Sequence, residues 1–333
     1  MTDLHLGARG RRLLTVPAIA AALALTAAGC GTGTADAETG PVETVSITDS
    51  QGRTVAVPKD PEVVVATDWS VVRTLNDLGV EVDAVPSSAG ALPEDLARYA
   101  GDEVPKIGGV KELDYEAINA LEPDVVLVGS RSGTPEIVAE MEKITPAVVD
   151  MSVRPETPEQ TLPLTTERVV QLGSIFGLEA EAEQRMAEAT AAVEEVAAKA
   201  EESGETAMFV QVSGGTASAY GPGSRFGTIY SDYGFVPTDA PVDDEGGHGQ
   251  EISAEFFAEY DPDVVYVLDR AKAIGDDETP ALDVLDNGLV NSTTAARNGK
   301  VLEVDGFAWY LANAAPSSIE QMTADVDRAF SAS

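Results

Sequence analysis

Two stretches of the chain match each other in pattern: Asp114-Tyr-Glu-Ala-Ile-Asn-Ala-Leu-Glu-Pro-Asp-Val-Val-Leu-Val128 and Ser253-Ala-Glu-Phe-Phe-Ala-Glu-Tyr-Asp-Pro-Asp-Val-Val-Tyr-Val267. Each matched pair of residues lies 139 positions apart. Both stretches open with a residue that caps helices, carry Glu in the first helical turn, and reach Pro-Asp before an apolar run. A helix followed by a strand that is apolar on both faces is typical of a parallel sheet. The repeat therefore predicts two halves built alike.

The same alternation of short apolar runs and helical patterns continues on both sides of the repeat. Pro135 begins one of the helices, at a position where its missing N–H costs nothing. Alternating strands and helices predict an α/β fold of two Rossmann-like lobes with mostly parallel sheets. The expected strands are 63–66, 82–85, 124–128, 147–150, 207–212, 263–268 and 300–304, and the expected helices are 71–78, 115–121 and 135–144.

Residues 179–202 form a third kind of segment. They are rich in Ala and Glu and contain no Gly or Pro, which predicts one long helix. Met186, Ala189, Val193 and Val196 fall on one face of it. We expect this helix to join the two lobes and to limit their hinge motion; the alternative is an ordinary surface helix of one lobe.

The N-terminus has the pattern of an export signal. Arg9, Arg11 and Arg12 precede a short apolar run, and Ala27-Ala28-Gly29-Cys30 follows it. This ending resembles a bacterial lipobox, in which the peptidase cuts before a Cys that is then lipidated; the alternative is a plain signal peptide. The arginine pair also allows twin-arginine export. The expected parts are a signal peptide 1–29, a lipidated Cys and tether 30–45, an N-terminal lobe 46–178, the interlobe helix 179–202 and a C-terminal lobe 203–333.

Composition restricts the classes of function. The 333 residues are 44% hydrophobic, enough for two sizeable cores. They carry 21 basic and 57 acidic side chains, a net charge of −36. So acidic a chain repels a nucleic-acid backbone, which excludes DNA and RNA as partners. An anionic ligand would need a local basic pocket, and the single cysteine excludes an intramolecular disulfide.

Three arginines are candidates for such a pocket. Arg131 and Arg270 have the same offset of 139 and each follows its repeat strand. Ligands of open α/β sheets bind beyond the carboxyl ends of the strands. Arg225 lies in Gly221-Pro-Gly-Ser-Arg-Phe-Gly227, whose glycines indicate a tight, ordered loop. The alternative is that these are surface arginines in loops.

Two further residues could bind a metal. His248 stands between glycines, and it is the sole histidine of the chain once residues 1–29 are removed. Tyr310 belongs to an unusually aromatic Trp309-Tyr310-Leu311. Imidazole and phenolate are both competent ligands for ferric iron. The alternatives are a solvent-exposed histidine and an aromatic core anchor.

Taken together, these motifs resemble the iron–siderophore-binding lipoproteins of ABC importers, the class III binding proteins with a rigid interlobe helix. The likeness covers nearly the whole chain after the signal peptide, from Asp49-x-x-Gly-Arg-x-x-x-Val-Pro58 to the Trp-Tyr-Leu. Gly-Pro-Gly-Ser-Arg-Phe-Gly, His-Gly-Gln, Val-Leu-Asp-Arg and Trp-Tyr-Leu are similar to the branch that binds catecholate siderophores, including petrobactin and anguibactin.

The resemblance implies a role for each candidate. Arg131, Arg225 and Arg270 would meet the anionic ferric catecholate with Trp309 beside them. His248 and Tyr310 would complete the coordination of iron when the siderophore is tetradentate. Glu116 and Glu255 would dock into the permease, and Cys30 would carry the lipid. After Tyr310, Ala312-Asn-Ala-Ala-Pro316 replaces the Gly-rich turn that is usual in the family, which affects the pocket size.

The expected function is capture of a ferric siderophore at the outer face of the cytoplasmic membrane, by a monomer without intrinsic cofactor or catalysis. Its partners would be the siderophore, the ABC permease and, through the permease, the cytoplasmic ATPase. One alternative is the same class of protein binding haem, cobalamin, a hydroxamate siderophore or a bare divalent metal. Another is a lipid-anchored α/β enzyme for an anionic substrate, and a third is an adhesion or scaffold lipoprotein.

Overall fold

The N-terminal half contains a small parallel sheet. The computed structural model describes residues 43–87, 90–243 and 249–331. Strands β3 (Val64–Ala66), β6 (Val125–Val128) and β7 (Val148–Asp150) pair in parallel with β6 in the middle, and every residue in them is buried. The strand predicted at 82–85 was wrong as a regular element, because this segment makes only isolated bridges at Ala84 and Val85.

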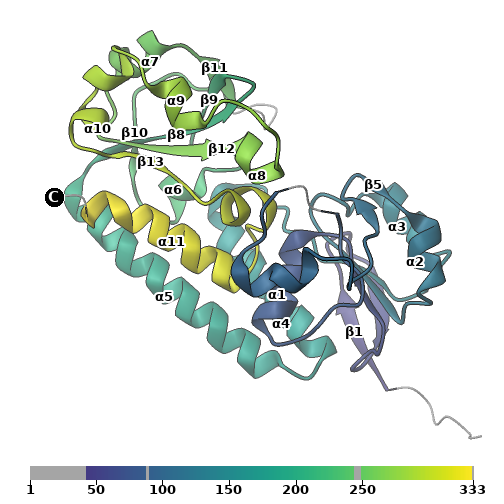
Figure 1. Ribbon diagram of the computed structural model, residues 1–333. Coiled ribbons are helices and arrows are strands. Elements are labelled where there is room, and N and C mark those ends of the chain that lie inside the picture. The colour runs from purple at the N-terminus through teal and green to yellow at the C-terminus, as the bar shows by residue number, and fades with distance from the viewer. Residues whose placement is uncertain (1–42, 88–89, 244–248, 332–333) are drawn as a thin grey trace, which may run out of the picture. The chain divides into compact units, whose positions relative to one another are not determined.

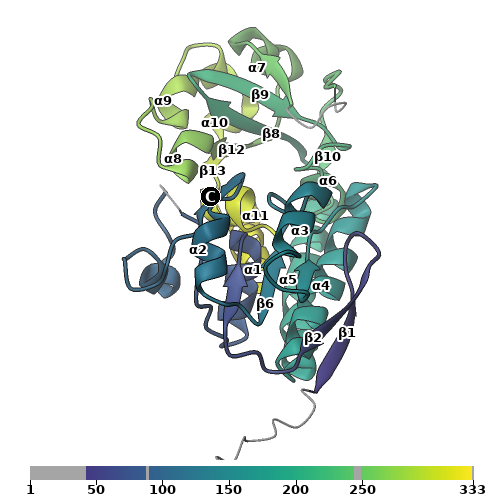
Figure 2. The same cartoon turned by 90° about the vertical axis from the view of Figure 1, so that its right-hand side faces the viewer.

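Short helices and two small hairpins surround this sheet (Figure 2). The 15-residue helix α4 was not predicted; its sequence contains Pro163 and Gly173, which interrupt a helical pattern. The elements of this half are β1 (Thr44–Thr48), β2 (Thr54–Pro58), α1 (Trp69–Asp77), η1 (Glu94–Tyr99), β4 (Gly108–Gly109), β5 (Glu112–Leu113), α2 (Tyr115–Ala120), α3 (Pro135–Met141), η2 (Pro158–Gln160) and α4 (Thr161–Ile175).

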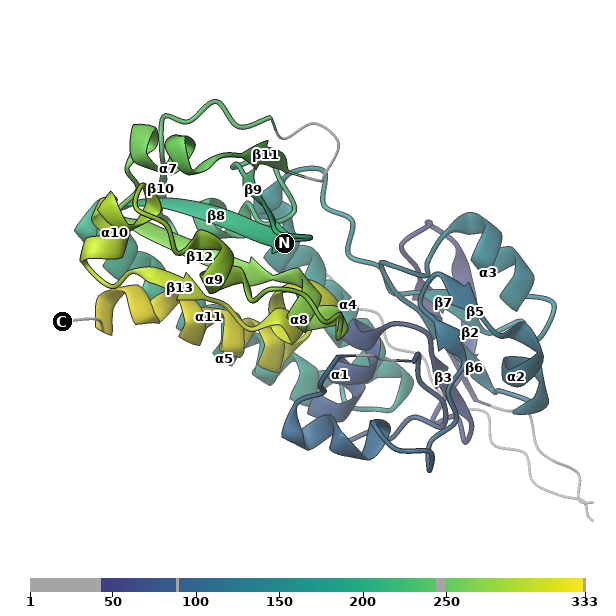
Figure 3. The same ribbon diagram turned by 45° about the horizontal axis from the view of Figure 1, so that its top comes forward.

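The C-terminal half contains a mixed sheet in the order β11-β9-β8-β12-β13, with β10 pairing with β8 (Figure 3). The pairs of β8 with β12, β12 with β13 and β10 with β8 are parallel, whereas β9 is antiparallel to β8 and β11. Sheets and helices thus give the predicted α/β class. The strands are β8 (Thr206–Ser213), β9 (Thr216–Tyr220), β10 (Val236–Pro237), β11 (Gln250–Ile252), β12 (Val264–Asp269) and β13 (Val301–Glu303).

The helices of this half are short except for the last one. A π-helical turn, η4, precedes that helix and carries the predicted Trp-Tyr-Leu. The elements are α6 (Thr228–Ser231), α7 (Ala254–Tyr260), α8 (Arg270–Ile274), α9 (Ala281–Leu285), η3 (Val290–Ser292), α10 (Thr294–Arg297), η4 (Phe307–Leu311) and α11 (Pro316–Ser331).

Two long helices connect the halves: α5 (Glu179–Ser203) and α11. They lie side by side and pack against each other, teal and yellow in Figure 1. The apolar face predicted for α5 is confirmed, since Met186, Ala189, Val193 and Val196 are all buried. α11 brings the chain back to α1, where the Asp77 carboxylate accepts the backbone N–H of Ser317 at 3.0 Å. The second connection, through α11, was not predicted.

The Pro-Asp of each repeat holds the start of the neighbouring strand. The Asp124 carboxylate accepts the backbone N–H groups of Glu62 and Val63, both at 2.9 Å, just before β3. The Asp263 carboxylate accepts the N–H and the hydroxyl of Thr206, both at 2.9 Å, where β8 begins. In both halves, the Asp of the repeat therefore ties its own strand to the start of the neighbouring strand, in addition to following the helix.

The residues before the two prolines also share a conformation. Glu122 has φ 51° and Asp261 has φ 33°, both in the left-handed region that non-glycine residues rarely adopt. This backbone reversal ends each helix and directs the chain into the buried strand. One detail of the repeat was wrong: Asp114 caps α2 with its side chain, but Ser253 makes no such bond to α7.

Candidate functional site

Tyr310 is held by a π-helical turn anchored in the core. The N–H of Ala312 donates to the carbonyl of Phe307 at 2.8 Å, a bond that spans five residues. Trp309 is 1% exposed, and its indole N–H donates to Asp325 at 3.0 Å. These buried neighbours fix the backbone on both sides of Tyr310, whose own side chain stays partly exposed.

Three arginines surround the Tyr310 ring. The guanidinium carbon lies 4.4 Å from the ring centroid for Arg131, 4.7 Å for Arg225 and 5.8 Å for Arg270. Arg131 also donates to the Tyr310 carbonyl at 2.6 Å, and Arg270 Nε donates to the Tyr310 hydroxyl at 3.0 Å. Arginines from both halves of the chain thus converge on one phenol, at distances suited to cation–π contact.

Arg131 follows β6, and a buried carboxylate holds its backbone. Asp68, which is 1% exposed, accepts the N–H of Arg131 at 3.2 Å and the N–H of Ser70 at 2.9 Å. Gly129 is required beside it, because a Cβ there would lie 2.4 Å from the Asp68 Cβ. Burial raises the pKa of Asp68, although these N–H donors and the Arg131 charge oppose the shift.

Arg225 projects from the predicted tight loop. The Ser224 N–H donates to Gly221 at 3.1 Å, and the Gly227 N–H donates to Ser224 at 2.9 Å. A Cβ on Gly227 would lie 2.2 Å from the Pro222 carbonyl oxygen, so only glycine fits. Phe226, next in the chain, is buried, whereas Arg225 is exposed and its guanidinium lies 4.5 Å from the Phe226 ring centroid and 4.7 Å from that of Tyr310. Desolvation by its neighbours still lowers the pKa of Arg225, which stays protonated at neutral pH.

Arg270 is the first residue of α8, directly after β12. The preceding residue, Asp269, caps this helix and accepts the N–H of Lys272 at 2.9 Å. The Arg270 guanidinium donates to the Ser213 hydroxyl at 3.3 Å, at the carboxyl end of the adjacent strand β8. Two neighbouring parallel strands therefore position this arginine.

The arginines change the acidity of Tyr310. Burial of the phenol favours its neutral form, but the hydrogen bond from Arg270 and the charges of Arg131, Arg270 and Arg225 outweigh burial and lower the pKa of Tyr310. The site therefore stabilises negative charge at this oxygen. It is suited to an anion and to an anionic oxygen ligand of a metal.

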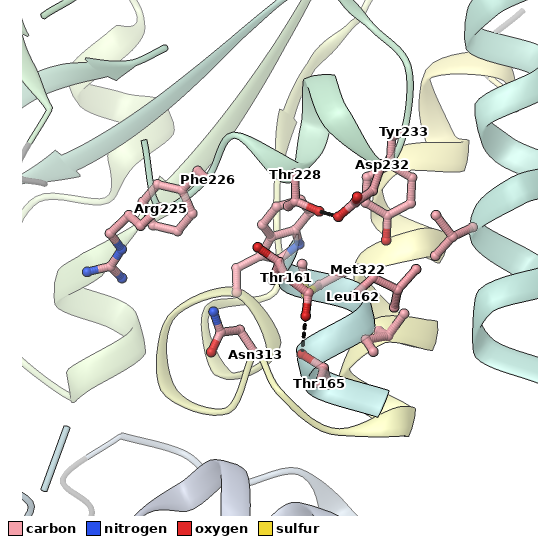
Figure 4. A pocket seen from close by; sticks show the side chains of 13 residues that line it. Thr161, Leu162, Thr165, Arg225, Phe226, Thr228, Asp232, Tyr233, Asn313 and Met322 are labelled. Carbon is pink, nitrogen blue, oxygen red and sulfur yellow. Dashed lines mark hydrogen bonds between the residues drawn. The ribbon is translucent and has the colours of Figure 1, made fainter. Parts of the chain in front are cut away.

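Two cavities lie beside Arg225. A small one of about 30 Å³ is lined by Thr228, Asp232 and the buried aromatic core, and Arg225 points away from the other side chains labelled there (Figure 4). A second one of about 280 Å³ lies between residues 153–161 and the loop of Arg225. We name it the threonine cavity, after Thr157, Thr161, Thr165 and Thr228 in its lining.

A cavity of about 440 Å³ elsewhere between the halves is unsuited to an anion. Its lining includes Asp269, Glu303, Asp305 and Asp325, with Lys272 as its one cation. The arginine cluster is therefore the better anion site within the described part of the chain.

The chain matches the model of the periplasmic binding protein family over residues 64–306. It belongs to this family. It is 30% identical over 295 residues to the ferric-anguibactin-binding protein FatB of Vibrio anguillarum, covering 87% of this chain and 89% of the relative. It is 29% identical over 270 residues to the petrobactin-binding protein YclQ of Bacillus subtilis, covering 81% and 83%. The crystal structure of the periplasmic catecholate-siderophore binding protein VctP from Vibrio cholerae has a TM-score of 0.78 and 31% identity, covering 86% of this chain and 100% of that one.

The membership agrees with the expectation of a binding protein rather than an enzyme, because these relatives are named as binding proteins. The division of this periplasmic binding protein into lobes at 46–178, 179–202 and 203–333 stays a prediction. Residues 42–333 form one compact unit.

The other predicted site residues of this binding protein have different surroundings. Trp309 lies in the core behind Tyr310, so its contact with a ligand stays a prediction. Glu116 and Glu255 are exposed in the first turns of α2 and α7. A hydrogen bond from the Ser253 hydroxyl lowers the pKa of Glu255. His248, Cys30 and the signal peptide lie outside the described residues.

Residues 43–87, 90–243 and 249–331 contain no cluster of three or more His, Cys, Asp or Glu side chains arranged to hold a metal. Within the same ranges, no helix has the length and apolar content to cross a membrane.

Sequence reasoning did not find the residues that position the arginines. Asp68 and Ser213 each stand at or after the end of a parallel strand, which is the signal that identified Arg131 and Arg270. The side chain of Asn313, in the turn after Tyr310, lines both cavities beside Arg225. These contacts join segments far apart in the chain, so no local pattern predicts them.

Proposed function

We propose that this protein captures a ferric siderophore of the catecholate type outside the cytoplasmic membrane and delivers it to an ABC permease for iron uptake. One observation carries the proposal: three arginines from both halves of the chain surround one phenol, in a protein whose net charge is −36. The relatives named for petrobactin, ferric anguibactin and catecholate siderophores support it.

The charges of the ligand and the site match. A ferric complex with two catecholates carries net −1, and one with three carries net −3. Arg131, Arg225 and Arg270 bring three positive charges and planar N–H donors, which form short, charge-assisted hydrogen bonds with catecholate oxygens. A ferric trihydroxamate is neutral, so it would leave the three guanidinium groups unmatched.

Tyr310 and His248 would act as metal ligands when the siderophore supplies four oxygens. Six-coordinate iron then has two free positions, which a phenolate and a neutral imidazole can fill. The lowered pKa of Tyr310 favours the phenolate. A hexadentate siderophore needs neither residue, so His248→Ala should weaken tetradentate complexes far more than hexadentate ones.

Membrane attachment and docking complete the proposal. The lipid on Cys30 would hold a monomer at the outer face of the cytoplasmic membrane. Glu116 and Glu255 occupy matched positions in the repeat, are exposed, and have no ion-pair partner among the described residues. They would dock, one from each half, into basic pockets of the permease. The permease would then carry the ligand across the membrane, driven by the cytoplasmic ATPase.

A fluorescence titration tests the ligand. Residues 31–333, which contain the whole compact unit, are titrated with ferric bis-catecholate, tris-catecholate, citrate–catecholate and trihydroxamate complexes. Trp69 and Trp309 are both buried, so quenching reports a bound coloured complex near the core. We expect submicromolar quenching by catecholates and none by the trihydroxamate.

Two results would count against this function. Equal binding of the trihydroxamate would show that the arginines do not select the ligand. No quenching by any complex, in a sample shown to be folded by circular dichroism, would favour another ligand such as haem or cobalamin, or the enzyme hypothesis.

A further inference from the structure

The threonine cavity has a chemistry different from that of the arginine cluster. Its volume of about 280 Å³ is far above the roughly 10–15 Å³ that one water molecule needs. Arg225 is the one cation in its lining and also contacts the Tyr310 ring, so the cavity adjoins the arginine cluster. A ligand whose iron centre lies at the arginines can therefore extend a second part into this cavity.

Three of the six hydroxyl side chains that line the cavity already donate their protons within the protein. Ser224 donates to the Gly221 carbonyl at 2.7 Å, Thr165 donates to the Thr161 carbonyl at 2.8 Å, and Thr228 donates to Asp232. A hydroxyl that has donated its proton offers only lone pairs to a ligand. These side chains thus act as acceptors toward the cavity.

Two further side chains in the lining remain available. Within the described ranges, the Glu156 carboxylate and the Asn313 amide make no hydrogen bond or ion pair with the protein. Glu156 is the only acidic residue of this lining. The free groups are therefore a carboxylate and an amide, surrounded by hydroxyl oxygens.

Away from Arg225, such a lining does not fit the catecholate end of the ligand, whose oxygens are anionic acceptors. It fits N–H donors, and best of all a positively charged one. We propose that the threonine cavity binds the spacer that links the iron-chelating groups, and that Glu156 and Asn313 select a spacer carrying an ammonium or amide N–H. This inference rests on the proposed function and adds to it the chemistry of the spacer.

A pair of ligands that differ in one group tests the proposal. Both are linear bis-catecholates with spacers of equal length; one contains a secondary amine, protonated at pH 7, and the other contains an ether oxygen. The same protein, residues 31–333, is titrated with their ferric complexes. Glu156 and Asn313 are both exposed, so we expect the ammonium complex to bind only about three- to tenfold more tightly.

Three variants show where the preference arises. Glu156→Gln should reduce the preference to less than about twofold by weakening the ammonium complex more than the ether complex, while Asn313→Asp should increase the preference by adding a second carboxylate. Glu136→Gln removes the same charge from an exposed site outside the cavity. It should leave the preference unchanged, which controls for the general attraction of an acidic protein for cations.

The outcomes separate the two proposals. Equal affinities for the two complexes in the unmodified protein, or a preference that persists in Glu156→Gln, would overturn the role of the cavity and leave the proposed function standing. If neither complex binds to folded protein, the proposed function fails, and the inference fails with it.

Discussion

Tyr310 shows how neighbouring charges set the protonation of one side chain. Buried phenols are normally harder to ionise, as the raised pKa values of Tyr233 and Tyr266 illustrate in the same half. At Tyr310 the opposite holds, because the hydrogen bond from Arg270 and the charges of three arginines outweigh desolvation. Tyr310 therefore releases its proton more easily than an ordinary tyrosine.

This shift predicts a pH dependence of binding. A phenol that binds iron must release its proton, so affinity for a tetradentate ferric complex should rise with pH, by up to about tenfold per pH unit below the Tyr310 pKa. Because the folded pKa is lowered, the rise should level off at a lower pH than an ordinary phenol allows. Tyr310→Phe should remove the rise, which titrations across a pH series would measure.

A hexadentate tris-catecholate provides the control, since it leaves no iron position for the phenol. Its affinity should show the same pH profile in Tyr310→Phe as in the unmodified protein. Identical profiles of the two proteins with the tetradentate complex would exclude Tyr310 as an iron ligand.

At the scale of elements, α1 and α11 form a contact that fixes the two halves. The Asp77 carboxylate accepts the N–H of Ser317 at 3.0 Å and its hydroxyl at 2.7 Å, and it pairs with Arg73 at 3.3 Å. Burial raises the pKa of Asp77, which the bonds to Ser317 and the Arg73 charge oppose. Asp77 thus caps α11 through Ser317, which lies 240 residues further along the chain.

Replacing this cap should destabilise the whole fold. Asp77→Ala removes the cap and one partner of a largely buried arginine, which predicts a loss of about 1–3 kcal/mol in the free energy of unfolding. Asp95→Ala removes an exposed partner of the same Arg73 and should cost at most about 1 kcal/mol. Urea denaturation of both variants measures the difference in the free energy of unfolding. Equal losses would show that Asp77 contributes no more to stability than the exposed Asp95.

Some elements can be predicted from local sequence patterns alone. The buried strands β6 and β12 and the helices before them were predicted correctly, because their signals are local: an apolar run, a cap and a proline. The helix α11 has a regular apolar spacing, with Ile319, Met322 and Val326 buried, and could have been found in the same way. The segment at 82–85 could not, because whether apolar residues pair as a strand depends on their neighbours in space.

At the scale of the whole molecule, the net charge of −36 opposes the arrival of an anionic ligand. Charges farther apart than the screening length of about 8–10 Å at moderate salt are largely screened, so added salt weakens this long-range repulsion. The association rate constant for a ferric tris-catecholate should therefore increase as salt is raised from low to physiological concentration. The less charged bis-catecholate should show a smaller increase.

Stopped-flow fluorescence of the buried tryptophans measures these rates. Dissociation rates serve as the internal comparison, since they depend on contacts within the site that salt screens less. An association rate that decreases with salt would mean that the arginine cluster, rather than the acidic surface, dominates the field met by the ligand.

The return of α11 to the N-terminal half also has a consequence for the order of synthesis. Ile319, Met322 and Val326 belong to the same hydrophobic cluster as Met186 and Phe209, so this cluster stays incomplete until α11 has emerged from the ribosome. A nascent chain that lacks them exposes apolar surface along α5 and β8. Translation products that stop before Pro316 should therefore remain open to proteases, which limited proteolysis of such truncated chains would measure.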